Sequence, residues 1–69
     1  MTYESISNFM NLHESPCIAE NENGETVIIE RFKDDNNEYF YRMQTAQKND
    51  WLRINEYYAD GTVTETYER

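Results

Sequence analysis

The sequence predicts an α+β fold: a four- to five-stranded antiparallel sheet with one or two short N-terminal helices packed on one face. Two observations predict it. Four stretches alternate polar residues with Val, Ile, Thr, Tyr, Phe or Trp, and this period of two is typical of half-buried strands. The breaks between the stretches are rich in Asn, Asp and Gly, which favour turns. The four stretches are residues 25–33, 37–45, 51–58 and 62–67.

A chain of 69 residues is expected to form a single domain, residues 1–69, in two parts. Residues 25–69 hold the four strands as a consecutive meander, and residues 1–24 hold an edge strand and short helices. Asp60-Gly61 lies between two alternating runs and predicts a two-residue hairpin loop. Residues 27–29 are all apolar, so this strand is either covered on both faces or leaves one face for a partner.

The first residues allow two interpretations. One is a helix over residues 3–13, whose apolar face follows helical spacing: Tyr3, Ile6, Met10 and His13. In the other, Ser7 caps a shorter helix over residues 8–13 and residues 2–6 are extended. The residues covering the sheet would then be Phe9, Met10 and Leu12.

The segment that follows is expected to add one more helical turn. Pro16 suits the first position of a helix, with Ser15 as its cap. Residues 17–19 are apolar and would form the turn, and Gly24 would end the helix after a polar stretch.

The net charge is −8, from fourteen acidic and six basic residues. Such a charge repels nucleic acid and anionic membranes and steers the chain toward basic surfaces, although it also serves solubility. The start, Met1-Thr-Tyr-Glu, lacks the pattern of a signal peptide, and no apolar run is long enough to span a bilayer. We therefore expect a cytoplasmic protein without membrane contact.

Catalysis and metal binding have little support. His13, Ser15 and Cys17 are close in sequence, but this spacing does not bring a nucleophile and a base together. A single Cys excludes an intrachain disulfide, and one Cys with one His cannot complete a zinc site. The segment from Asp34 lacks the Gly and Glu that a calcium loop requires. We expect neither enzyme activity nor a cofactor or metal.

The order of the pieces resembles the phage uracil-DNA glycosylase inhibitors. Glu4-Ser5-Ile6 is similar to a Glu-Ser-Ile triplet on an exposed edge strand in that family, and a helical stretch and the strands follow it. The likeness continues in residues 26–29, 38–45 and 51–61, so it spans nearly the whole chain. Two departures are that only three residues precede Glu4, and that Pro16 and Cys17 lie in the connection to the sheet.

The resemblance implies a DNA-mimicking inhibitor that forms a 1:1 complex with a host uracil-DNA glycosylase and binds no nucleic acid itself. Glu4 would stand in for a phosphate, Ser5 would add a polar contact and Ile6 would pack beside them. The side chain that the enzyme inserts into the minor groove would enter an apolar pocket between sheet and helix. Strand parity and position give its candidate lining residues as Met10, Ile28, Tyr41, Met43 and Ile54.

Three alternatives remain. Glu4-Ser5-Ile6 is also compatible with a helix start, with Glu4 near the positive helix end and Ile6 in the core. The protein could instead inhibit another nucleic-acid enzyme, as a phage anti-CRISPR protein does. It could also be a structural module that forms a homodimer by pairing sheet edges.

Overall fold

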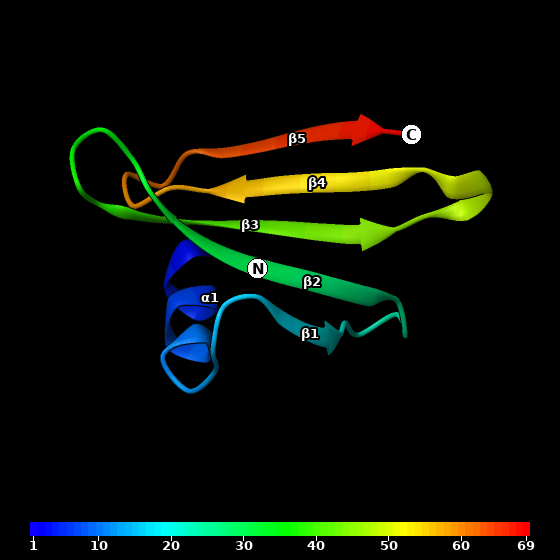
Figure 1. Ribbon diagram of the computed structural model, residues 1–69, viewed down its shortest axis with the longest axis horizontal. Helices are drawn as coiled ribbons and strands as arrows, with labels where there is room; N and C mark the ends of the chain where they lie inside the picture. The colour runs from blue at the N-terminus through cyan, green and yellow to red at the C-terminus, as the bar shows by residue number, and fades with distance from the viewer.

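The computed structural model describes residues 1–69 as one α-helix and a five-stranded sheet (Figure 1). The elements in chain order are α1 (Tyr3–Met10), β1 (Cys17–Glu20), β2 (Thr26–Lys33), β3 (Tyr39–Ala46), β4 (Leu52–Tyr57) and β5 (Val63–Glu68), with a short 3-10 turn (Lys48–Asp50) before β4. Each strand pairs antiparallel with the next, so the sheet order equals the chain order. The predicted α+β class is confirmed, and so are the four strands of residues 25–69.

Helix α1 begins at a capping box. The Thr2 hydroxyl accepts the backbone N–H of Ser5 at 3.2 Å, and the Ser5 hydroxyl accepts the backbone N–H of Thr2 at 3.0 Å. These bonds satisfy donors that a helix start would otherwise leave free. A helix that starts at Tyr3 is thus confirmed, although it ends at Met10 instead of residue 13. The extended alternative for residues 2–6 is wrong.

Residues 17–20 form strand β1, so the predicted second helical turn is wrong. Cys17 lies opposite Ile29 and Ala19 lies opposite Val27 in the antiparallel register. Four residues are too few to form a stable helix alone, and pairing with the apolar start of β2 decides their conformation. Gly24 therefore does not end a helix; it lies in the loop between β1 and β2.

Three of the four hairpin loops share one backbone pattern. The residues that flank each loop are joined by a backbone hydrogen bond, and the last loop residue has a positive φ: Gly24 (76°), Asn37 (63°) and Gly61 (91°). Gly and Asn adopt this left-handed conformation most readily. The N–H of Tyr58 donates to the Thr62 carbonyl at 2.9 Å. The β4–β5 loop is therefore three residues long, 59–61, and the two-residue loop that Asp60-Gly61 predicted is wrong.

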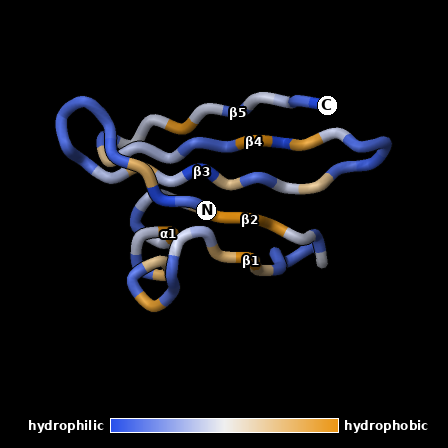
Figure 2. The backbone as a smooth tube through the Cα atoms, viewed as in Figure 1, coloured by the Kyte–Doolittle hydropathy of each residue, from blue (hydrophilic) through white to orange (hydrophobic).

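The sheet has two faces of different character. We call the side that packs on α1 the helix face and the opposite side the open face, because no element covers it (Figures 1 and 2). Strand alternation and register assign the residues to faces. Those of the helix face are odd-numbered in β1 to β5, beginning with Cys17 and ending with Tyr67. Those of the open face are even-numbered, beginning with Ile18 and ending with Glu68.

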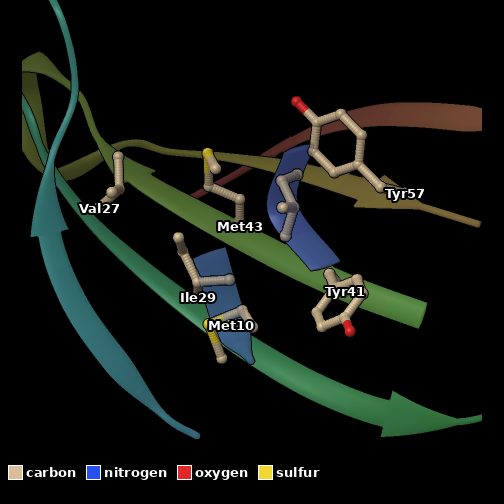
Figure 3. Close-up of a cluster of buried hydrophobic side chains, with 7 residues drawn as sticks. Met10, Val27, Ile29, Tyr41, Met43 and Tyr57 are labelled. Atoms are coloured by element: carbon tan, nitrogen blue, oxygen red, sulfur yellow. The ribbon is translucent and has the colours of Figure 1, made fainter. Parts of the chain in front are cut away.

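The core lies between α1 and the helix face. Ile6 and Met10 of α1 are fully buried against side chains of β2, β3 and β4. The core side chains of the strands, shown with Met10 in Figure 3, are Val27, Ile29, Tyr41, Met43 and Tyr57. Arg31 Nη2 donates to the Met10 carbonyl at 2.8 Å and so supports the carboxyl end of α1 with a positive charge. One short helix thus accounts for the only covered face of the sheet.

Glu25, the residue before β2, interacts with three polar side chains. Its carboxylate accepts from Asn21 at 2.9 Å and from Gln47 at 3.3 Å, and it forms the chain's one salt bridge with Arg53, at 3.7 Å. The hydrogen bond from Asn21 lowers the pKa of Glu25 most, the charge of Arg53 and the bond from Gln47 lower it further, and partial burial opposes them. Ionised Glu25 therefore stabilises the folded chain.

Replacing Ile6 by Ala should cost about 2 to 5 kcal/mol of unfolding free energy, because the side chain is fully buried and leaves a cavity. Leu12→Ala is the control: Leu12 is 83% exposed, so a change within about 0.5 kcal/mol is expected. Urea unfolding followed by circular dichroism measures both. Equal, small effects would show that Ile6 is not in the core.

Glu25→Gln should destabilise the protein at neutral pH and lose this effect in acid. The pKa of Glu25 is lower in the folded chain than in the unfolded chain, so its contribution is present above the unfolded pKa and disappears as the pH falls through the folded pKa. The gap in melting temperature between wild type and variant should narrow from about pH 7 to about pH 3. Glu22→Gln, an exposed carboxylate in the same loop, should show no gap; a constant gap for Glu25→Gln would contradict the account.

Candidate protein-binding surface

The Glu4-Ser5-Ile6 triplet does not form the predicted enzyme-binding edge strand, because all three residues lie in α1. Ile6 is fully buried, and the Ser5 hydroxyl is engaged in the capping box, where it also donates to the Thr2 carbonyl at 3.0 Å. Glu4 and Ser5 are both exposed, but only the Glu4 side chain has no hydrogen-bond partner within the chain. The helix-start alternative for this triplet is therefore the correct one.

The five predicted pocket residues are divided between the two faces of the sheet. Met10, Tyr41 and Met43 belong to the core on the helix side, whereas Ile28 and Ile54 lie on the open face. The prediction of one shared pocket is therefore wrong. Both faces of β2 and β4 carry apolar residues, so alternation alone did not reveal which face of the sheet α1 covers.

Hollows do exist between α1 and the sheet, around Met1. The most apolar has a volume of about 80 Å³ and is lined by Phe9, Ala19, Val27 and Met43 among others; Met43 is the only predicted pocket residue in it. A wider one, of about 600 Å³, separates the start of α1 from the β4–β5 loop and includes Glu4. These hollows are open gaps beside the exposed chain start, since Met1 is 70% exposed.

The open face presents apolar side chains that nothing in the chain covers. Ile18 is 73% exposed, and Ile28 and Phe32 are each 37% exposed. Ile54, in the middle of this face, is buried only by its neighbours on the sheet, because it is not part of the core against α1. Contiguous exposed apolar surface on a small protein is typical of a site for a partner.

Three aromatic rings form a row across one end of the open face. Phe32, Phe40 and Tyr58 come from β2, β3 and the end of β4. The ring centroids of Phe32 and Phe40 are 5.5 Å apart with planes at 26°, and those of Phe40 and Tyr58 are 5.0 Å apart at 20°. These near-parallel rings stack in an offset manner, which is a favourable arrangement of aromatic pairs.

The strands give the open face a negative charge. Its charged strand residues are Glu20, Glu30, Arg42, Glu56 and Glu68. Arg42 lies opposite Glu30 and Glu56 in register, yet it makes no salt bridge with either. Glu30 instead accepts from Gln44 at 2.9 Å, and Glu56 accepts from Thr64 at 3.4 Å. Both carboxylates are half-buried, and neither forms a salt bridge.

The strand cations lie mostly on the other side. Arg31, Lys33 and Arg53 belong to the helix face, where Arg31 and Lys33 lie over the ring of Tyr39, at 5.3 Å each. The net charge of the chain is therefore unevenly divided between the two faces. Sequence reasoning missed this division, although the alternation of Glu30 with Arg31 and of Arg53 with Glu56 carried the signal.

The negative charge also reaches the aromatic row. Burial raises the pKa of Tyr58 most, and the charge of Glu56, its hydrogen bond and the charge of Asp34 raise the pKa further. The charge of Asp34, which follows β2, raises the pKa of Tyr3 in α1 as well, so it acts on both sides of this end of the sheet. The arrangement combines one exposed ring, Phe32, and two half-buried rings with acceptor oxygens, which suits a positively charged partner.

No group of three or more His, Cys, Asp or Glu residues gathers where it could hold a metal ion. The helix is too short and too polar to cross a membrane.

Comparisons with models of protein families, with curated proteins and with solved structures each find no match.

Replacing Glu56 by Gln should lower the pKa of Tyr58, because it removes a negative charge that disfavours the phenolate. Carbon-detected NMR titration of the tyrosines measures this pKa directly. Glu68→Gln, at the far end of the open face, should leave it unchanged. An unchanged pKa in Glu56→Gln would show that the acidic groups do not act on the aromatic row.

Proposed function

We propose that the protein is an acidic inhibitor that covers the basic, nucleic-acid-binding surface of a partner enzyme with its open face. The observation that carries the proposal is the uncovered open face, on which the apolar side chains of Ile18, Ile28 and Phe32 are exposed beside carboxylates that form no salt bridge. Apolar contact supplies affinity, and complementary charge supplies the rate and specificity of association.

The carboxylates allow the protein to compete with nucleic acid. An enzyme that binds DNA lines its groove with Lys, Arg and backbone N–H groups that contact phosphate oxygens. Glutamate and aspartate oxygens accept the same charge-assisted hydrogen bonds. With a net charge of −8, the protein is attracted to such a groove over distances of about 10 Å at moderate salt.

Uracil-DNA glycosylase is the proposed target, on the basis of the resemblance in sequence order. The edge-strand mechanism is not part of the proposal, because Ile6 is buried and Ser5 is engaged within α1. Only Glu4 of that triplet remains free to contact the enzyme. The open face takes over the role that the triplet had in the prediction.

Inhibition of uracil release tests the proposal directly. Purified protein is mixed with a bacterial uracil-DNA glycosylase and a uracil-containing oligonucleotide, at protein concentrations up to a large excess over enzyme. We expect uracil release to stop, and added DNA without uracil to relieve the inhibition. Raising NaCl from about 50 mM to about 500 mM should weaken it, because salt screens the exposed charges. Undiminished uracil release at excess protein would reject the glycosylase as target.

Two double variants with equal net charge identify the face that binds. Glu30→Gln with Glu56→Gln removes two carboxylates from the open face, and inhibition should weaken by about tenfold. Glu22→Gln with Glu65→Gln removes two exposed carboxylates elsewhere and should change inhibition little. Equal effects of the two pairs would show that charge acts without regard to face.

Two other occupants of the open face give distinct outcomes. A second copy would appear as a stable dimer in light scattering, which the charge of −8 on each copy disfavours. Another nucleic-acid enzyme would leave the glycosylase active but would itself lose DNA binding in the presence of the protein. The first result would contradict the proposal, and the second would change only the target.

A further inference from the structure

The aromatic row of the open face has an unoccupied end at Phe32. One face of this ring lies against Phe40, and the chain places no aromatic ring or cation against the other. Strand β1 pairs with β2 only as far as the position of Ile29; beyond it, the segment before β1 reaches β2 through the Ser15 hydroxyl, which accepts the backbone N–H of Arg31 at 2.9 Å. Phe32 is 37% exposed, whereas Phe40 and Tyr58 are half-buried.

Carboxylates lie on both sides of Phe32 along the chain. Glu30 is two residues before it on the same face, about 7 Å away by strand geometry, and Asp34 follows two residues after it. Each carboxylate uses one oxygen within the chain: Glu30 Oε1 accepts from Gln44, and Asp34 Oδ1 accepts the backbone N–H groups of Asn36 and Glu38. The second oxygen of each has no hydrogen-bond partner in the chain.

The helix face shows how this chain engages a guanidinium. Arg31 lies over the rings of Tyr39 and Tyr41, at 5.3 Å and 6.0 Å, while its Nη2 donates to the Met10 carbonyl. One guanidinium thus stacks on rings and donates to oxygen at the same time. The end of the aromatic row at Phe32 offers the same two features, a ring face and unused acceptor oxygens; Arg42 lies opposite Glu30, but no cation lies over the ring of Phe32.

We propose that the free face of Phe32 receives an arginine side chain of the partner, with Glu30 and Asp34 accepting its N–H groups. The inference rests on the proposed function, because it names the partner group that the open face binds. Arginine fits better than lysine because the guanidinium is planar, is weakly hydrated and can donate in a fork while it stacks.

Two short peptides test this without any enzyme: one repeats Arg-Gly and the other repeats Lys-Gly at equal length and charge. NMR titration of the isotope-labelled protein should show shifts centred on Glu30, Phe32 and Asp34, with roughly two- to fivefold tighter binding of the arginine peptide. Phe32→Leu should abolish the preference, and Phe32→Tyr should retain it. Tyr67→Leu, an exposed ring on the helix face, is the matched control and should retain it too.

Equal binding of the two peptides by the wild-type protein would overturn the inference, and so would shifts centred away from Phe32 or a preference that survives in Phe32→Leu. The comparison of the two peptides on the wild-type protein tests the inference even if the Phe32→Leu variant does not fold. The result is separable from the proposed function. An inhibited glycosylase with no arginine preference rejects this inference alone, and an arginine preference with an uninhibited glycosylase rejects the target alone.

Discussion

The packing of one short helix on one face of the sheet is the constraint from which the rest of the structure follows. Ile6 and Met10 are the only fully buried side chains of α1, and they close the core over β2, β3 and β4. A five-stranded sheet is wider than an eight-residue helix can cover, and the chain has no second helix for the other side. The open face, with Ile18, Ile28 and Phe32 exposed, is the direct consequence.

Strands β2 to β5 were predictable because their signals are local. Alternation identifies each strand, and Asn, Asp or Gly at the positive-φ positions identifies the loops. Strand β1 was not predictable, since residues 17–20 are extended only because β2 lies beside them. The helix start had a usable signal in Thr2 and Ser5, whose side chains form the capping box; the likeness of Glu4-Ser5-Ile6 to an edge strand obscured it.

The site was less predictable than the fold, for a physical reason. Alternation states which residues share a face but not which face the helix covers, and β2 and β4 are apolar on both. Ile28 and Ile54 were therefore grouped with Met10, Tyr41 and Met43, from which the sheet separates them. The order of charged residues along the strands distinguishes the two faces better than the apolar residues do. Glu30 and Glu56 share a face with Arg42, whereas Arg31, Lys33 and Arg53 lie on the other face, so the strand residues leave the open face negatively charged.

Solvent paramagnetic relaxation tests whether α1 covers one face of the sheet and leaves the other uncovered, because it reports the exposure of each side chain in solution. With an inert gadolinium chelate, the methyl groups of Ile18 and Ile28 should relax rapidly, while those of Ile6, Val27 and Ile29 should be protected. The pattern should be the same in dilute and concentrated solution, because a second copy is not the proposed occupant of the open face. Protected Ile18 and Ile28 together with an exposed Ile6 would contradict the account.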